Sequence, residues 1–209
     1  MERYRVWAAA WLAAAAICWI GTAYPAEPIV GTVLAVRGAV FADTGGGSQT
    51  LTVNAPLRRS DTITTNAGKA KIALNDGTVI SIAENTRLRL ADYDKASSGF
   101  RTRLALISGA MRVLVTKITP AGRFEVETET AIAAVRGTDW VIETTPAGTA
   151  VAVLRGAVAV SSLEAPPQSS VVLRSPGQGT DVPHGKAPTP PKPWGAERLA
   201  NIITRTAFD

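Results

Sequence analysis

The chain has very little of the chemistry on which most enzymes and metal sites depend. Its 209 residues include one cysteine (Cys18), one histidine (His184) and two methionines. Metal sites of the Cys/His type and catalysis by Ser/His or Cys/His pairs therefore have almost no side chains to draw on. Aromatic residues make up 6% of the chain, charged residues 19% and apolar residues 46%. This balance excludes a disordered protein, and beyond the first 30 residues the chain is too polar for several membrane spans.

The first 26 residues have the three-part layout of a secretory signal peptide. A short basic start at residues 1–5 precedes an uncharged apolar run at 6–20 and a small, turn-prone segment at 21–26. The run is shorter than the roughly 20 apolar residues of a spanning helix. We therefore expect cleavage, after Ala23 or Ala26, rather than an uncleaved N-terminal anchor that would tie the protein to the membrane. The mature protein is then periplasmic or secreted and depends on its core for stability.

Residues 29–173 are typical of a succession of short β-strands. Apolar residues alternate with charged or polar ones in four runs, namely 69–74, 86–90, 101–106 and 123–127. This period of two places alternate side chains on opposite faces of a strand and cannot be satisfied by a helix. In the last run, Phe124 and Val126 are predicted to point inward, whereas Glu125 and its charged neighbours are predicted to face water.

Glycines and turn residues separate these runs. Asn75-Asp76-Gly77 predicts a tight hairpin, because an Asp-Gly pair supplies the positive φ that such a turn needs. Further turns are predicted at residues 66–68, 120–122 and 146–148. A weak repeat places a glycine between two β-rich runs, and the glycines expected at turns or bends are Gly38, Gly77, Gly109, Gly137 and Gly156. The fold class is all-β, as either a solenoid-like or a sandwich-like stack of short strands.

The composition changes near the C-terminus. Residues 180–195 are rich in proline and predict an extended linker. Residues 196–209 can form a short helix with Leu199, Ile202 and Ile203 on one side, which is stable only if it docks. We expect it to cap an open end of the β-domain or to bind a partner. The predicted organisation is a signal peptide at 1–26, an all-β domain at 27–179, a linker at 180–195 and a helical tail at 196–209.

Carboxylates are the side chains that come closest to suggesting catalysis. The pair Asp92 and Asp94, or the comb Glu125, Glu127 and Glu129, could supply the acids of a glycosidase. Nothing in the sequence supplies the raised pKa that a catalytic acid requires. No segment has a complete calcium-loop spacing or the glycine pattern of a phosphate loop. We therefore expect no enzymatic activity, metal or cofactor, and the dispersed basic residues give no reason to expect nucleic acid.

Residues 135–141 are the most information-dense segment of the chain. They combine a glycine at a bend with a cation, a carboxylate and the one tryptophan of the strand region. Arg136, Asp139 and Trp140 are the candidate binding residues, since Trp and Arg are favoured anchors of interfaces. In the alternative interpretation, Trp140 fills the core while Arg136 and Asp139 fix the turn.

Several short motifs follow one another in a set order over residues 29–160. They are Gly31-Thr32-Val33, Gly38-Ala39-Val40, residues 61–65, 71–78 and 106–109, and the strand 124–128 followed by residues 134–140. In this order, and above all in Arg136-Gly137-Thr138 before an aromatic residue, the chain resembles the FecR domain, a bacterial envelope domain. The resemblance implies an all-β periplasmic domain without enzymatic activity.

The resemblance also implies a role in signalling. In iron-uptake signalling, such domains contact an outer-membrane receptor and relay its state through a membrane helix to a cytoplasmic segment that controls a sigma factor. Only residues 1–5 precede the apolar run here, so we expect a sensing or binding role without a sigma-binding segment.

The expected partner is an envelope protein, such as an outer-membrane receptor or a secretion component, held through exposed strand edges. The alternatives are a module that binds polysaccharide or peptidoglycan and, third, a glycan-cleaving enzyme. The sequence leaves the oligomeric state open.

Overall fold

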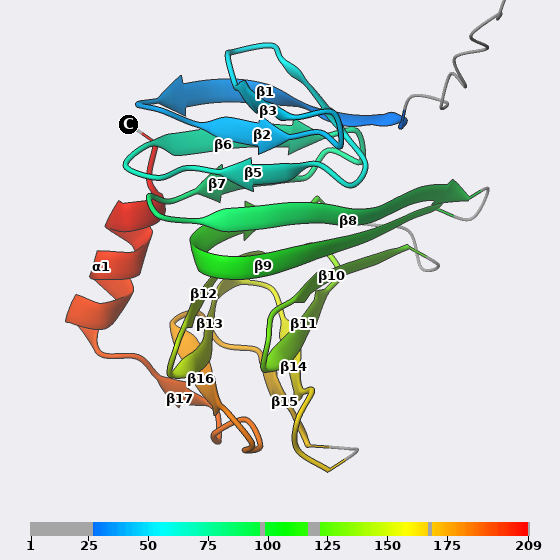
Figure 1. The fold of residues 1–209 in the computed structure, drawn as a ribbon. Coiled ribbons are helices and arrows are strands. Elements are labelled where there is room, and N and C mark those ends of the chain that lie inside the picture. Colours follow the sequence, from blue (N-terminus) through cyan, green and yellow to red (C-terminus); the bar gives the residue numbers. More distant parts are fainter. Residues whose placement is uncertain (1–26, 97–98, 117–121, 167–168, 209) are drawn as a thin grey trace, which may run out of the picture.

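The computed structural model describes residues 27–96, 99–116, 122–166 and 169–208 (Figure 1). The predicted signal peptide at 1–26 and most of the predicted turn at 120–122 lie outside these residues. The described chain is mostly β-strand with one helix near its C-terminal end, as the sequence predicts. In the part that the structure describes, no helix has the length and apolar character of a membrane span.

The strands form a continuous hydrogen-bonded network folded into two facing layers, here called sheet A and sheet B. In spatial order, sheet A contains β4 (Pro56–Arg58), β1 (Ile29–Arg37), β6 (Lys69–Leu74), β7 (Val79–Ile82), the second part of β9 (Gly99–Leu114), β12 (Asp139–Thr145), β13 (Gly148–Arg155), β16 (Gln178–Pro183) and β17 (Lys192–Pro193). Sheet B contains β3 (Ser48–Thr50), β2 (Phe41–Asp43), β5 (Thr62–Thr64), β8 (Arg87–Ala96), the first part of β9, β10 (Arg123–Glu127), β11 (Ala131–Val135), β14 (Val158–Ser162) and β15 (Ser170–Leu173).

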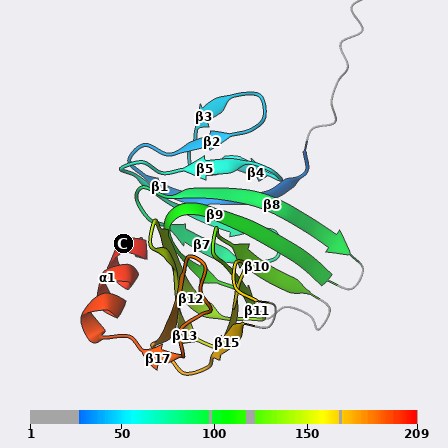
Figure 2. The same ribbon diagram turned by 60° about the horizontal axis from the view of Figure 1, so that its bottom comes forward.

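The long strand β9 takes part in both layers and holds them together. Its first part pairs with β8 and β10, and its second part pairs with β7 and β12. The pair of β9 and β10 is parallel, whereas the other recorded pairs are antiparallel. The architecture is therefore sandwich-like rather than a solenoid of repeating coils. In Figures 1 and 2, the paired β8 and β9 extend beyond the neighbouring strands on the side away from the helix.

The chain passes between the layers at residues with positive φ. Gly109 (φ 88°) lies inside β9, where the strand leaves sheet B and enters sheet A. Gly38, Gly137 and Gly156 (φ 70°, 91° and 97°) mark three other passages, whereas Gly77 (φ 83°) closes the predicted hairpin between β6 and β7. Glycine adopts such backbone angles without the steric cost that a Cβ brings. Residues other than glycine also have positive φ between strands, namely Asn54, Ser60, Asn66 and Asn85.

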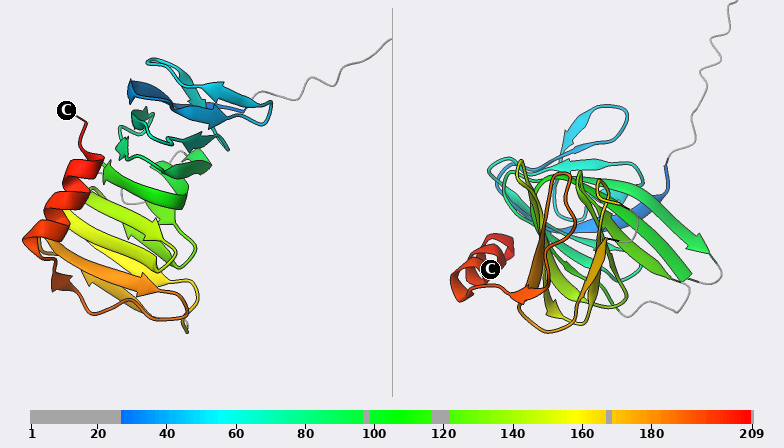
Figure 3. Two further views of the ribbon diagram at one scale, coloured as in Figure 1. Left: turned by 60° about the vertical axis from the view of Figure 1, so that its left-hand side comes forward. Right: turned by 90° about the horizontal axis from the view of Figure 1, so that it is seen from below.

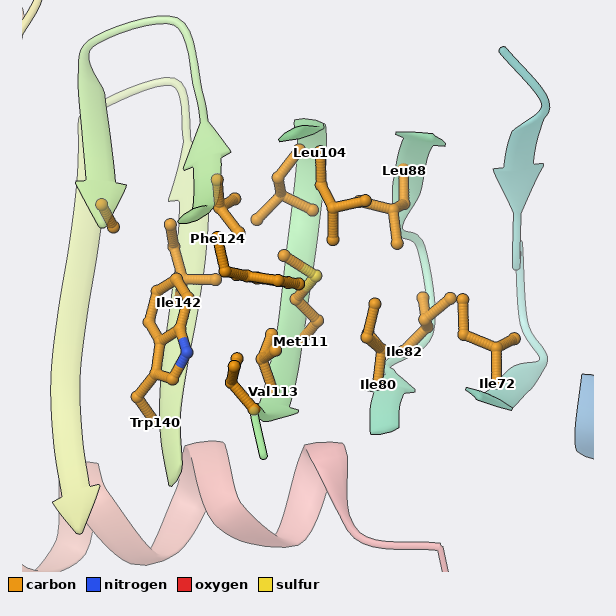
Figure 4. Packing of buried hydrophobic residues seen from close by; sticks show 14 of the residues in the cluster. Ile72, Ile80, Ile82, Leu88, Leu104, Met111, Val113, Phe124, Trp140 and Ile142 are labelled. Carbon is orange, nitrogen blue, oxygen red and sulfur yellow. The ribbon is translucent and has the colours of Figure 1, made fainter. Parts of the chain in front are cut away.

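The space between the layers is filled by one apolar cluster drawn from both sheets (Figure 4). The alternation in residues 69–74 is confirmed, because every second residue of β6, including Ile72, is buried. Phe124 and Val126 are buried as predicted, and Trp140 is fully enclosed. Burying one large apolar side chain contributes about 1.5–3 kcal/mol, so this core can sustain the fold without disulfides.

The segment predicted as a linker belongs in part to sheet A. β16 spans the predicted domain boundary at residue 179, and β17 pairs with it through the contact of Gly179 with Lys192. The following helix, α1 (Ala196–Thr206), lies along the outer face of sheet A (Figure 3), where Ile202 packs with Val141. The helix therefore covers the face of a sheet and does not cap an open end.

Trp194 holds this C-terminal segment on the sheet. Its indole ring lies so close to Gly179 that a Cβ at that position would be 2.8 Å from Cδ1 of the ring. The guanidinium group of Arg198 lies over the ring, 3.7 Å from its centroid. Arg205 adds an ion pair with Glu143 of β12 (2.6 Å). The absence of a side chain at residue 179 thus lets an aromatic ring dock where the sequence predicts only a linker.

Candidate functional site

A groove with a volume of about 860 Å³ lies on the outer face of sheet B. It crosses six neighbouring strands of sheet B, which lie side by side in Figures 1 and 2 in the order β8, β9, β10, β11, β14 and β15. The cross-strand register brings one residue from each strand into a row, in the order Asp92, Arg103, Glu125, Ala134, Ala159 and Val172. The row is charged at one end and apolar at the other.

Small side chains beside long ones produce the hollow. Ala134 and Ala159 reach only as far as Cβ, whereas the arginines of the neighbouring strands extend several ångströms further from the sheet. Val172, which is 40% exposed, closes the apolar end on the outermost strand of sheet B. The groove therefore has an apolar floor with a basic wall beside it.

The prediction that the side chain of Glu125 is exposed to water is wrong. Its relative exposure is only 9%. The Nε atom of Arg123 lies 2.7 Å from one carboxylate oxygen, and an NH2 nitrogen of Arg103 lies 3.6 Å from the other. A buried carboxylate is tolerated when charged partners compensate for its lost hydration. Arg103 also lies 3.9 Å from Asp92, so these four groups form a connected ion-pair network.

Two further arginines leave the groove with unneutralised positive charge. Arg101 lies opposite Asp94 on β8 and opposite Arg123 on β10, while Arg136 follows the end of β11. Both Arg101 and Arg136 are exposed, and no ion pair is recorded for either among the described residues. Four arginines and three carboxylates line the groove in all. An exposed guanidinium that lacks a carboxylate partner can pair with an anionic group of a ligand.

The three predicted binding residues do not meet at one surface. Trp140 is 0% exposed and points into the core together with Met111 (Figure 4), so its ring is not available to a ligand in this conformation. Asp139 accepts two hydrogen bonds from Arg112 (2.9 and 2.7 Å) rather than pairing with Arg136. The bond to Asp139 raises the pKa of Arg112. Of the three, only Arg136 lines the groove.

The structure brings some of the candidate acids together. Asp92, Asp94 and Glu125 line the groove, whereas Glu127 and Glu129 lie outside its lining. Asp92 and Glu125 both contact Arg103, so the two carboxylates do not face a shared open position. Among the described residues, no group of three or more His, Cys, Asp or Glu side chains could hold a metal ion. The arrangement can recognise a charged ligand. Of its acids, Asp92 and Glu125 are engaged in ion pairs, whereas no ion pair is recorded for Asp94 among the described residues.

A second, smaller hollow of about 380 Å³ lies beside the β8–β9 hairpin. Its lining includes Tyr93 and Phe100, whose ring centroids are 5.5 Å apart, and the exposed Ile29. Burial raises the pKa of the Tyr93 phenol. This hollow holds one aromatic pair but lacks the concentration of arginines that characterises the groove.

Sequence reasoning missed most of the groove. Arg101 and Arg103 stand at alternate positions of β9, and Ala157, just before β14, stands two residues from Ala159 within it. Small residues at outward positions of a strand signal a hollow only if they face long side chains on neighbouring strands. That pairing depends on register between distant segments, which the local pattern does not contain.

Comparisons with known proteins agree with the fold and the motifs. Residues 61–159 match the model of the family described as FecR protein, and none of the curated proteins compared with the chain matches it. Two crystal structures, at 1.65 and 2.50 Å resolution, show a Parabacteroides distasonis ATCC 8503 protein assigned as an anti-sigma factor. Both have a TM-score of 0.55 to this chain, with 21% and 22% sequence identity.

The alignment covers 66% of this chain and 62% of that protein, so the similarity concerns the fold over less than two thirds of its length. The matched family region contains every residue that lines the groove except Val172. Ordered motifs, all-β architecture and family match together identify residues 61–159 as a FecR domain.

Proposed function

We propose that this protein is a non-enzymatic regulatory module whose FecR domain binds a segment of an envelope protein in the groove on sheet B. The observation that carries the proposal is the position of the groove inside the residues that match the family. A regulatory role is supported by the family and by the anti-sigma factor assignment of the proteins with a similar fold.

The proposed location is the periplasm or the exterior of the cell. Support comes from the basic, apolar and small-residue layout of residues 1–26. An outer-membrane receptor or a secretion component is then the kind of partner that the domain can meet.

The lining of the groove favours a protein ligand over a saccharide. Sugar-binding surfaces commonly offer an exposed aromatic ring, whereas none of the described residues that line the groove is aromatic. Trp140 and Trp194 are both buried, the second at 7% relative exposure. Arginine is instead enriched among the residues that anchor protein interfaces.

Site-specific photo-crosslinking in cells tests the proposal. A photoreactive residue at position 159, on the floor of the groove, should crosslink to an envelope protein that mass spectrometry can identify. The matched control is position 161, which lies on the same strand outside the groove lining. The crosslink should be lost with Arg136→Glu and retained with Arg89→Glu, an exposed position elsewhere on sheet B. Equal products from positions 159 and 161, or no protein product from position 159, would contradict the proposal.

A further inference from the structure

We infer that the ligand of the groove is an extended, sparsely acidic peptide segment, with one carboxylate paired to Arg136 and an apolar side chain resting on the alanine floor. The inference rests on the proposed function and names the chemistry of the partner. It follows from the charge, the shape and the register of the groove.

The charges show which arginines are available to a ligand. Arg103 and Arg123 already bind Asp92 and Glu125. Arg136 is exposed at the edge of the groove and no ion pair is recorded for it among the described residues. A guanidinium remains charged at any physiological pH and binds a carboxylate through two parallel hydrogen bonds. An acidic side chain is therefore its natural complement.

The shape of the groove supplies the apolar half of the site. Ala134 lies two positions before Arg136 on the chain, and Ala159 of β14 lies directly opposite Ala134. Side chains on one face of an extended peptide repeat about every 6.6 Å, the same spacing as positions i and i+2 of a strand. A peptide that runs along β11 can thus place a carboxylate at Arg136 and its next same-face side chain over Ala134 and Ala159. Val172 borders this floor on its far side.

The acids of the groove limit how much negative charge the ligand carries. Asp92 and Asp94 line the same groove as the arginines. A ligand with a charge on every unit, such as a nucleic acid or a polyuronic acid, would bring some of its anions against these carboxylates, which costs binding energy. A peptide with one or two acidic residues avoids that repulsion while still engaging Arg136.

Fluorescence anisotropy with defined peptides and the full chain tests the inference. The probe is a labelled peptide of sequence Ser-Glu-Ser-Val-Ser-Glu-Ser, in which both acids and the valine share one face. Its counterpart carries lysine in place of both glutamates. We expect Arg136→Glu to weaken binding of the acidic peptide by about tenfold or more, because it replaces an attraction with a repulsion. Arg89→Glu is the matched control, since Arg89 is exposed on β8 outside the groove lining and should leave binding unchanged.

Two further variants separate charge from shape. Ala159→Trp fills the floor and should also weaken the acidic peptide, whereas Ser161→Trp, on the same strand outside the groove lining, should not. The lysine peptide should bind Arg136→Glu better than the wild-type protein, which is the signature of a direct charge contact.

Equal binding of the acidic peptide to wild type and Arg136→Glu would overturn the inference, and so would tighter binding of polygalacturonate than of the peptide. The crosslink from position 159 reports separately on the proposed function. If it identifies an envelope protein in a manner that depends on Arg136 while the acidic peptide fails, the partner site stands and the assigned ligand chemistry is wrong.

Discussion

Replacement of Gly109 by alanine tests how the two layers are joined. Gly109 has φ of +88° at the point where β9 leaves sheet B for sheet A. A Cβ at this position would lie 2.6 Å from the Cα atom of Thr86 and 2.7 Å from the carbonyl oxygen of Asn85. Both neighbours are backbone atoms, so the clash can be relieved only if one passage between the layers moves relative to the other.

The expected cost has two parts. A side chain at positive φ costs roughly 1–2 kcal/mol in backbone strain. The hydroxyl group of Thr86 also hydrogen-bonds the N–H and the carbonyl oxygen of Ala110, both at 3.1 Å, and both bonds are buried. Losing them costs about 1 kcal/mol each. Gly109→Ala should therefore lower the free energy of unfolding by about 3–4 kcal/mol, against typical totals of about 5–15 kcal/mol.

Gly45 provides the matched control for this measurement. It also has positive φ (60°), but a Cβ there would meet nothing within 4 Å. Gly45→Ala should cost only the backbone strain, about 1 kcal/mol. Urea unfolding, followed by the fluorescence of the buried Trp140, gives both values. If the two variants agree within about 1 kcal/mol, close backbone approach is not what requires glycine at residue 109.

Three other substitutions test separate features. Trp194→Ala should release α1, with a loss of about 3–5 kcal/mol in the free energy that holds the helix on the sheet. Limited trypsin digestion should then remove the C-terminal segment much faster than in the wild-type protein. Unchanged protection would show that other contacts hold the helix. Asp139→Ala leaves Arg112 without its carboxylate and should lower the free energy of unfolding by about 1–3 kcal/mol in urea, whereas no change would mean that the pair adds nothing. Burial raises the pKa of Asp61 above its ordinary 3.8, so its contribution to stability is greatest below that value and declines as pH rises through the higher folded-state pKa. Asp61→Asn should flatten this part of the pH profile of unfolding, and a profile that stays parallel to wild type would refute the assignment.

Much of the fold could be predicted because strands with one buried face leave a local pattern. The alternation in residues 69–74 gives the inward side of β6 correctly, and the same holds for Phe124 and Val126 of β10. The pattern fails at Glu125, whose charge suggests exposure. Arg103 and Arg123 enclose it, and one of them comes from a different strand. Alternation identifies the face of a residue but not what its neighbours bring to that face.

The glycines show the same division between local and distant information. A glycine within a strand pattern predicts a bend, and all of the predicted ones adopt positive φ. The sequence does not reveal which bends change layer, since that depends on the pairing of strands far apart in the chain. The turn predicted at residues 66–68 begins at Asn66, which has positive φ, whereas the positive φ of Asn85 falls where no turn is predicted.

Of the three predicted binding residues, only Arg136 lies in the groove, and its unusual local sequence singles it out. Asp92, Asp94 and Glu125, considered as acids of a glycosidase, also line the groove. The other groove residues have no unusual local sequence, and only the register of their strands brings them together. The decisive step is the parallel pairing of β9 with β10, which sets Arg103 opposite Glu125 and Arg101 opposite Arg123. Such a pair joins segments without a hairpin between them, so neither partner carries a turn that would fix the register.

The position of α1 is consistent with the proposed partner site on sheet B. The helix packs on the outer face of sheet A, where Val141 and Ala152 would otherwise be exposed apolar residues. A partner that approached those residues would first have to displace α1, together with the Trp194 contact and the ion pair of Arg205. No described helix covers the groove side of the domain. Helix α1 thus covers the outer face of sheet A, whereas a partner can bind in the hollow beside Arg136 without displacing any part of the protein.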